Sequence, residues 1–320
     1  MDDLRQPPLE APGSSAPARR RPGPGWWAVR IAIAVVLGLV VALGLDVVRS
    51  GGPQGWLSRH GLGVVGILGY RAEGELVEVS GRRLYLDCRG AGSPTIVLQA
   101  GLGTGAETWA AVLGDLAATT RTCAYDRPGI GRSDPGTTPD HAAAAADLAG
   151  ALAAAGEPGP FVLVGHSLGA DMVRVHASTY RDDVVGLVLV DGFEPDLFET
   201  HVAPLLGPLA EEYLDRQDGL WALVQRSEGL DPGRSMEQLR AADLRGLPIE
   251  AVVAARGEPR LDEATNTAIR RAAEAAYEAL SPGMARLTLA YSSGHLVQFD
   301  RPELVVEAVR RVVEAARGGA

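Results

Sequence analysis

Short apolar runs alternate with segments of helical periodicity from about residue 74 to the end of the chain. The apolar runs are short enough to be buried strands, and they occupy 76–79, 83–88, 96–99, 121–125, 161–164, 184–190, 249–254 and 286–290. Between them, apolar residues recur every three or four positions, most clearly in 140–155 and 301–316, which is typical of helices. The pattern therefore predicts a body in which strands alternate with helices.

The beginning of the chain has a different pattern. Residues 1–25 contain six prolines and few apolar residues, so we expect a disordered tail. Residues 31–45 carry no charge and follow Trp26 and Trp27, so they predict a transmembrane helix over 26–48. A glycine-rich linker at 49–73 joins this helix to the body.

The charges around this helix predict its orientation. Arginines at 19–21 and at 30 precede it, and positive flanks are typical of the cytoplasmic end of a membrane helix. We therefore expect a single-pass protein at the cell membrane, with its body outside the cytoplasm. The alternative is a cleaved signal peptide, because Ala42-Leu43-Gly44 fits a cleavage site, and the body would then be secreted.

The charge composition bears on whether the body binds nucleic acid. The 320 residues carry a formal net charge of −10, and all 30 basic residues are arginines. Nucleic-acid binding requires clustered cations, and no basic stripe occurs between residue 74 and the C-terminus. The chain is therefore not expected to bind nucleic acid.

Residues 165–169 read G-H-S-L-G and lie between the apolar run 161–164 and a helical segment that begins near residue 170. A sharp strand-to-helix turn of this kind requires small residues beside the serine, which Gly165 and Gly169 provide. Such a turn exposes the hydroxyl of Ser167 and leaves the N–H of Leu168 to stabilise an oxyanion. His295 follows the run 286–290 and could serve as the base that activates Ser167.

With these motifs the chain resembles the α/β-hydrolase fold superfamily in its lipase- and esterase-like branch. Residues 125–134 are similar to the D-x-x-G-x-G-x-S loop after strand 4, and residues 96–103 resemble strand 3 running into the oxyanion loop. Relatives often have His-Gly in that loop where this chain has Ala100-Gly101. The expected second oxyanion donor is the backbone N–H of Leu102.

The resemblance implies an α/β fold with a mostly parallel eight-stranded sheet flanked by helices. It places the first part of the hydrolase core at 74–192, a helical cap after strand 6 at 193–247, and the second part of the core at 248–320. Apolar side chains of the cap could line a pocket for an acyl chain or form the core of the cap itself. Glu199 and His201, also in the cap, are interpreted as surface residues rather than metal ligands.

The acid of the triad has three candidates. The usual family position, three residues past a glycine after strand 7, holds Arg260, which cannot orient an imidazole. Some relatives take the acid from the end of strand 6, where this chain has Asp191. We therefore favour Asp191, with Asp262 and Glu258 as alternatives.

Cys88 ends the second predicted strand and Cys123 begins the fourth. In this fold the two strands lie antiparallel side by side, so a disulfide between these residues is predicted, and two buried thiols are the alternative. Export would permit the bond.

The resemblance implies a serine hydrolase that acts on a small-molecule carboxylic ester or related acyl compound. No metal or organic cofactor is expected. Amidases, peptidases and lactonases of the same fold remain alternatives, as does a non-catalytic binding protein. Haloalkane dehalogenases and epoxide hydrolases are disfavoured, because they have aspartate in place of the serine.

Overall fold

The computed structural model describes residues 70–318, apart from 193, 195, 196, 208 and 256–259. The predicted tail at 1–25, the predicted membrane helix at 26–48 and the linker up to residue 69 therefore lie outside the described residues. Within the part that is described, no helix combines the length and the apolar character that crossing a bilayer requires.

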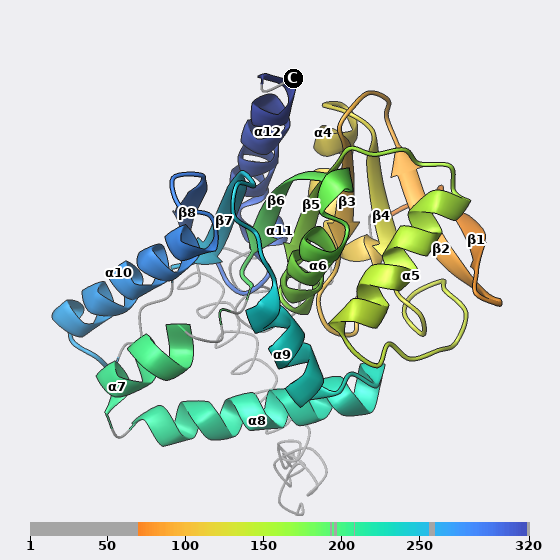
Figure 1. Cartoon of the computed structure of the whole chain (residues 1–320). Coiled ribbons are helices and arrows are strands. Elements are labelled where there is room, and N and C mark those ends of the chain that lie inside the picture. The colour runs from red at the N-terminus through yellow and green to blue at the C-terminus, as the bar shows by residue number, and fades with distance from the viewer. Residues whose placement is uncertain (1–69, 193, 195–196, 208, 256–259, 319–320) are drawn as a thin grey trace, which may run out of the picture. The chain divides into compact units, whose positions relative to one another are not determined.

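A single sheet organises the described residues (Figure 1). Its eight strands are β1 (Glu75–Val79), β2 (Arg82–Arg89), β3 (Thr95–Gln99), β4 (Thr122–Asp126), β5 (Phe161–His166), β6 (Val184–Val190), β7 (Ile249–Ala254) and β8 (Ala285–Ala290). They lie in the order β1-β2-β4-β3-β5-β6-β7-β8. β2 pairs antiparallel with β1 and β4, and the other pairs are parallel. The prediction of a mostly parallel eight-stranded sheet is confirmed.

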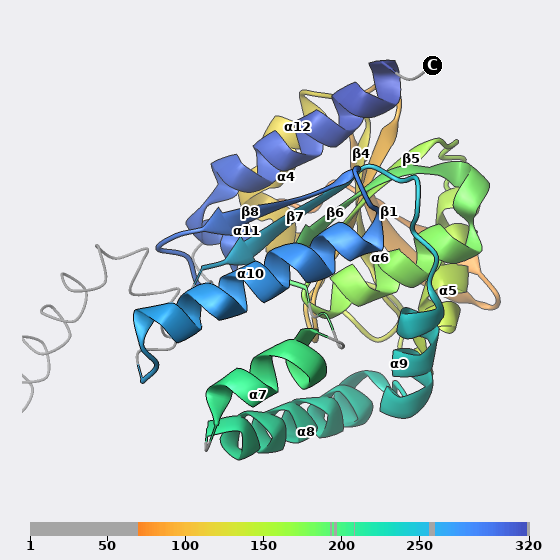
Figure 2. The ribbon, with the colours of Figure 1, turned by 60° about the vertical axis from the view of Figure 1, so that its left-hand side comes forward.

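Helices cover both faces of the sheet, and Figure 2 shows α12 and α4 on one face and α5, α6 and α10 on the other. The helices of the body are η1 (Ala106–Trp109), α4 (Ala110–Ala117), α5 (His141–Ala154), α6 (Leu168–Thr179), η2 (Arg181–Asp183), α10 (Glu263–Leu280), α11 (Val297–Asp300) and α12 (Pro302–Gly318). Successive side chains of β5 point to opposite faces of the sheet and so enter two separate cores. Phe161 and Leu163 lie in the core beneath α5 and α6, and Val162 and Val164 lie in the core beneath α4 and α12. Buried parallel strands thus hold the carboxyl ends of β5 and β6 in fixed positions.

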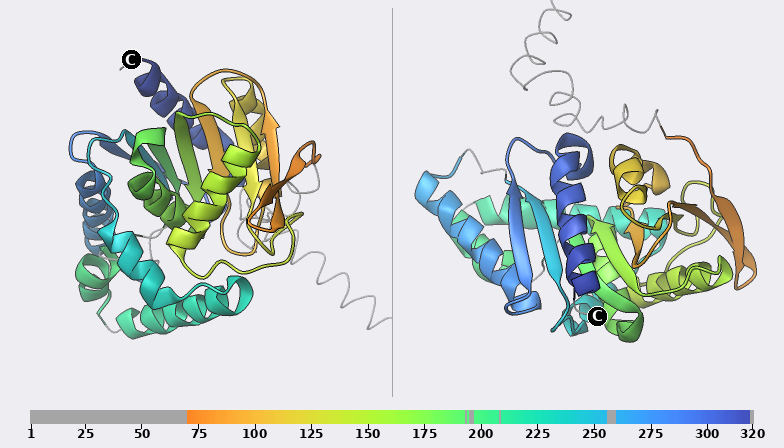
Figure 3. Two further views of the ribbon diagram at one scale, coloured as in Figure 1. Left: turned by 45° about the vertical axis from the view of Figure 1, so that its right-hand side comes forward. Right: turned by 90° about the horizontal axis from the view of Figure 1, so that it is seen from above.

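A helical segment at 197–241 connects β6 with β7. It consists of η3 (Leu197–Val202), α7 (Ala203–Leu206), α8 (Leu209–Glu228) and α9 (Pro232–Ala241). In Figure 1 α8 runs below the sheet, and the left view of Figure 3 shows α9 leading back toward α5 and α6. Val224 on α8 and Leu230 after it pack against Leu168 and Met172 of α6. The segment is therefore anchored on the helix that begins directly after Ser167.

A disulfide joins Cys88 to Cys123, the pairing that the sequence predicts. The two residues lie directly opposite each other in the antiparallel register of β2 and β4, with Cα atoms 3.9 Å apart. The bond therefore links β2, in the antiparallel edge of the sheet, covalently to β4, which begins its parallel part.

Candidate active site

Ser167 occupies a strained turn between β5 and α6. Its backbone has φ 52° and ψ −124°, a conformation that residues other than glycine rarely adopt. A Cβ at position 165 would lie 2.4 Å from the carbonyl oxygen of Gly169, and a Cβ at position 169 would lie 2.2 Å from that of Gln99. Glycine is therefore required on both sides of the turn, and surrounding backbone holds the strain in place.

Asp191 and His295 are brought together beside this turn. Asp191 follows β6 directly, and its Oδ2 lies 2.7 Å from Nδ1 of His295. Its Oδ1 accepts a hydrogen bond of 2.8 Å from the N–H of Ala254, which fixes the carboxylate from the other side. With Nδ1 of the imidazole engaged, Nε2 is the nitrogen that can exchange a proton. Ser167, Asp191 and His295 all line one cavity.

Of the two alternative acids, Asp262 lies at the start of α10, and Glu258 lies outside the described residues. Asp262 precedes α10, and its Oδ1 accepts a hydrogen bond of 2.7 Å from the N–H of Thr265. Hydrogen bonding to Thr265 lowers the pKa of Asp262, as expected for a carboxylate that caps a helix. Arg260, in the usual family position, pairs with Glu212 at 2.8 Å.

Three further side chains form hydrogen bonds with the loops that carry Asp191 and His295. Nε2–H of His166 donates to the carbonyl oxygen of His295 over 2.8 Å, and burial lowers the pKa of His166 to about 4. The Tyr277 hydroxyl donates to the carbonyl of Gly192, the residue after Asp191, at 3.1 Å. Asp300 accepts a 2.6 Å hydrogen bond from the N–H of Gly294. Neither Tyr277 nor Asp300 could be identified from the sequence, because such side chain–backbone contacts leave no periodic pattern.

The two predicted oxyanion donors, Leu168 and Leu102, belong to segments that adjoin Ser167. Leu168 is the first residue of α6, where backbone N–H groups have no acceptor within the helix. Leu102 lies in the loop after β3, and this loop packs closely on the turn: a Cβ at Gly101 would lie 3.2 Å from Cβ of Ser167. Both leucines line the cavity that holds Ser167.

This cavity has a volume of about 530 Å³. Its lining residues are Gly101, Leu102, Thr104, His166, Ser167, Leu168, Asp171, Asp191, Gly192, Leu220, Trp221, Val224, His295 and Leu296. Helix α8 contributes Leu220, Trp221 and Val224, so the helical segment forms one wall. Leu205 of α7 and Leu214 and Leu223 of α8 are exposed, and so is Leu220, at 52%.

Asp171 is a lining residue that the sequence reasoning missed. It is 2% exposed, lies in α6 four positions after Ser167, and lines the same cavity. That spacing was a usable signal. Asp171 and Asp191 are the two acidic residues of a lining that is otherwise largely apolar.

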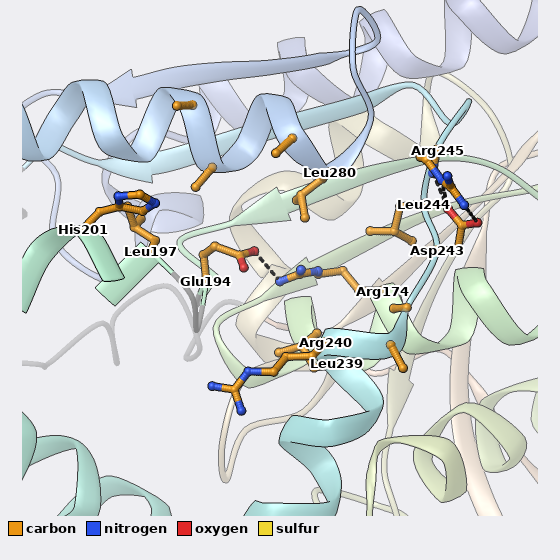
Figure 4. Close-up of a pocket in the computed structure, with 15 residues that line it drawn as sticks. Arg174, Glu194, Leu197, His201, Leu239, Arg240, Asp243, Leu244, Arg245 and Leu280 are labelled. Carbon is orange, nitrogen blue, oxygen red and sulfur yellow. Dashed lines mark hydrogen bonds and ion pairs between the residues drawn. The ribbon is translucent and has the colours of Figure 1, made fainter. Parts of the chain in front are cut away.

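A second cavity of about 550 Å³ lies between α6, α9 and α10 (Figure 4). Two ion pairs lie within its lining: Arg174 pairs with Glu194 at 2.9 Å and Arg245 with Asp243 at 2.6 Å. A third arginine of the lining, Arg240, pairs with Glu199 at 3.2 Å. The described residues that line it include no serine, threonine or cysteine. It therefore offers no hydroxyl or thiol of these residue types, whereas the first cavity contains the hydroxyl of Ser167.

Within the part of the chain that the structure describes, one group of residues has metal-ligand geometry: Cys88, Cys123 and Glu157. Both cysteines are consumed by the disulfide. Glu199 of the helical segment lies 3.2 Å from Arg240.

Comparison with known proteins identifies the fold. Residues 94–225 match the family model of the alpha/beta hydrolase fold. Similar solved structures include an esterase from Thermogutta terrifontis (TM-score 0.50, 22% identity, 77% of this chain and 99% of that one). A provisionally assigned lipase from Acinetobacter baumannii (TM-score 0.55, 16% identity, 82% and 97%) is also similar. So is the haloalkane dehalogenase DatA from Agrobacterium tumefaciens (TM-score 0.52, 17% identity, 78% and 99%). The chain has the α/β-hydrolase fold.

Curated relatives match over shorter segments. RutD of Azorhizobium caulinodans, provisionally named a carbamate hydrolase, is 35% identical over 141 residues, which are 42% of this chain and 52% of the relative. An uncharacterised protein of Bacillus subtilis is 35% identical over 104 residues, 32% of this chain and 41% of the relative. The chain thus spans about half or less of the length of these relatives. The fold hosts several reactions, so the reaction must be argued from the site.

Proposed function

We propose that this chain is a serine hydrolase that cleaves a carboxylic ester through an acyl-enzyme. The observation that carries the proposal is the 2.7 Å contact between Asp191 and His295 in the cavity that also holds Ser167 on its strained turn. A nucleophile, a base and an orienting acid around one cavity are the parts that acyl transfer requires.

In the proposed reaction, Oγ of Ser167 attacks the carbonyl carbon of the ester while Nε2 of His295 accepts the hydroxyl proton. The N–H groups of Leu168 and Leu102 stabilise the tetrahedral oxyanion. The C–O bond then breaks, and His295 returns the proton to the departing alcohol. Water attacks the acyl-enzyme by the same steps and releases the acid. Asp191 remains a carboxylate throughout, holding the imidazole and stabilising its charged form.

The cavity supports an ester with an apolar acyl or alcohol group. Its walls on α8 are Leu220, Trp221 and Val224, and burial of each additional methylene there is worth about 0.8 kcal/mol. We therefore propose medium-length aliphatic esters as the first substrates to test.

Carbamates are a second candidate class, favoured by the segmental similarity to RutD. The attack on a carbamate carbonyl would use the same residues, and the carbamoyl-enzyme would be hydrolysed in the same way. Competition between a carbamate and an ester for Ser167 would show whether both enter the site.

We further propose that residues 26–48 anchor the chain in the cell membrane and that the body lies outside the cytoplasm. The sequence pattern of residues 31–45 and the disulfide between Cys88 and Cys123 support this proposal, because disulfides persist mainly in oxidising compartments. Secretion after signal cleavage is the alternative.

The test of the proposed reaction is turnover of a nitrophenyl ester series by the purified protein. Ser167→Ala should lower kcat by at least about 10³-fold, because the nucleophile is lost while the fold is kept. Ser227→Ala, which removes a hydroxyl on an exposed part of α8, is the matched control and should keep wild-type turnover. Equal turnover by Ser167→Ala and wild type would refute the proposal.

A further inference from the structure

Arg127 is almost fully buried beside the oxyanion loop. It follows β4 directly, and its side chain is 1% exposed. Its Nη1 donates to the carbonyl oxygen of Ala100 over 2.5 Å and its Nη2 to that of Gly101 over 2.7 Å. One guanidinium therefore holds two successive carbonyls of the loop that carries Leu102.

Glu228, the last residue of α8, completes this arrangement from the other side. Its Oε1 and Oε2 accept hydrogen bonds from Nη2 and Nε of Arg127 over 2.7 and 2.8 Å. Oε1 also accepts a 2.7 Å hydrogen bond from the N–H of Gly103. The loop is thus held immediately before Leu102 by Arg127 and immediately after it by Glu228.

The geometry of the peptide bond gives this contact a consequence for catalysis. The carbonyl of Gly101 and the N–H of Leu102 belong to one planar trans peptide, so the two groups point in opposite directions. When Arg127 fixes the carbonyl, it also fixes the direction of the N–H. A cationic donor on the carbonyl polarises the peptide and strengthens the N–H as a hydrogen-bond donor.

Stability alone is a weak explanation for this pair. Burying two charges costs desolvation energy that their mutual attraction often only balances, and apolar replacements of similar size are frequently as stable. Besides binding each other, the two side chains form hydrogen bonds with the backbone of one loop. They also connect that loop to α8, the helix that supplies Trp221 and Val224 to the cavity.

We propose that Arg127 is the positioning residue of the oxyanion peptide Gly101–Leu102 and that Glu228 couples this peptide to α8. Neither residue touches the substrate. The inference rests on the proposed hydrolysis at Ser167, and it adds that the strength of the oxyanion site depends on an ion pair formed between the body and the helical segment.

The chain offers a close control for this role. Arg121 precedes β4 as Arg127 follows it, and it also binds a glutamate, Glu157, and two carbonyl oxygens, those of Cys88 and Gly90. These partners lie at the opposite end of β4 from the Ser167 turn. Arg121→Lys therefore matches Arg127→Lys in chemistry without touching the oxyanion loop.

The test compares Arg127→Lys, Glu228→Gln and Arg121→Lys after the active sites of each preparation have been titrated. Lysine cannot hold two carbonyls and a carboxylate at once. We expect Arg127→Lys to lower kcat by about 10- to 100-fold with KM within about threefold, and to weaken inhibition by an alkyl boronic acid by a similar factor. Glu228→Gln, which keeps an oxygen for the N–H of Gly103, should show the same changes at smaller size. Arg121→Lys should match wild type.

Titration separates positioning from folding. A merely structural role would lower the number of active sites and leave kcat per site and boronic acid affinity unchanged, which would overturn the inference. Glu228→Gln gives the same comparison if Arg127→Lys does not fold. Turnover that survives Ser167→Ala would instead refute the proposed function. Turnover that depends on Ser167 but is unchanged in both Arg127→Lys and Glu228→Gln would refute only the inference.

Discussion

Asp191 and His295 are 104 positions apart in the chain, and their side chains meet at 2.7 Å. The contact depends on two parallel strand ends: Asp191 leaves β6 with φ 45°, and the N–H of Ala254 at the end of β7 binds its second carboxylate oxygen. The carboxylate is therefore oriented before any substrate arrives.

Asp191→Asn should lower kcat by roughly 10²–10⁴-fold, because the amide cannot hold His295 in the same tautomer or stabilise its charged form. Initial rates on a nitrophenyl ester measure this directly. Asp262→Asn is the control, because Asp262 caps α10 and is not in contact with His295. A large loss in Asp262→Asn with none in Asp191→Asn would show that the wrong carboxylate has been assigned.

Trp221→Ala should change the preference for acyl length. Trp221 lines the cavity at Ser167, and its loss removes apolar wall worth about 1–2 kcal/mol to a long acyl chain. We expect kcat/KM for a hexanoyl ester to fall about 5- to 30-fold more than for an acetyl ester. Leu223 lies on the same helix at an exposed position, so Leu223→Ala should leave the ratio of kcat/KM for the hexanoyl ester to that for the acetyl ester unchanged. If wild type and Trp221→Ala had the same ratio of kcat/KM values for the two esters, the acyl chain would not bind against Trp221.

Stability should fall as the pH drops from about 6.5 to about 4. Burial lowers the pKa values of His141, His166 and His176 to about 4, so in this interval the unfolded chain binds protons that the folded chain does not. Each histidine can contribute up to about 3 kcal/mol to the loss, which levels off below pH 4. Burial raises the pKa of Asp126 and acts in the opposite direction.

A variant separates the histidine contribution from that of Asp126. His176→Gln should reduce the pH-dependent change in the free energy of unfolding by roughly one third, measured by urea unfolding at pH 7, 6, 5 and 4. An unchanged slope in the variant would mean that His176 titrates normally in the folded protein.

The N-terminal proposal predicts that the protein remains with membranes after a carbonate wash and that its mass still includes the residues before Trp26. Labelling of thiols under denaturing, non-reducing conditions should find neither Cys88 nor Cys123. Reducing the bond should cost about 3–4 kcal/mol of stability, because it closes a loop of 35 residues. Two reactive thiols in protein from its native compartment would argue against both the disulfide and export.

Local sequence patterns were sufficient for the fold and for the Ser167 turn. Gly165 and Gly169 mark that turn in the sequence: Gly165 meets the backbone of Gly169 and Ala170, and Gly169 meets that of Gln99 on the neighbouring strand. The strand pattern predicted the sheet. Asp191 could be chosen only because Arg260 occupies the alternative position. Glu228 could not be found in this way: it lies 101 positions from Arg127, and the contact exists only because α8 folds back over the body. Charged residues at a helix end are common on surfaces, so the sequence carries no sign that this one is buried.

The most direct test of the central claim is covalent labelling with a fluorophosphonate, followed by mass spectrometry of the digested protein. The phosphonyl group should be found on the peptide that contains Ser167, and labelling should be lost in Ser167→Ala and much slower in Asp191→Asn. Native protein that stays unlabelled, or that carries the group on another serine, would contradict the account.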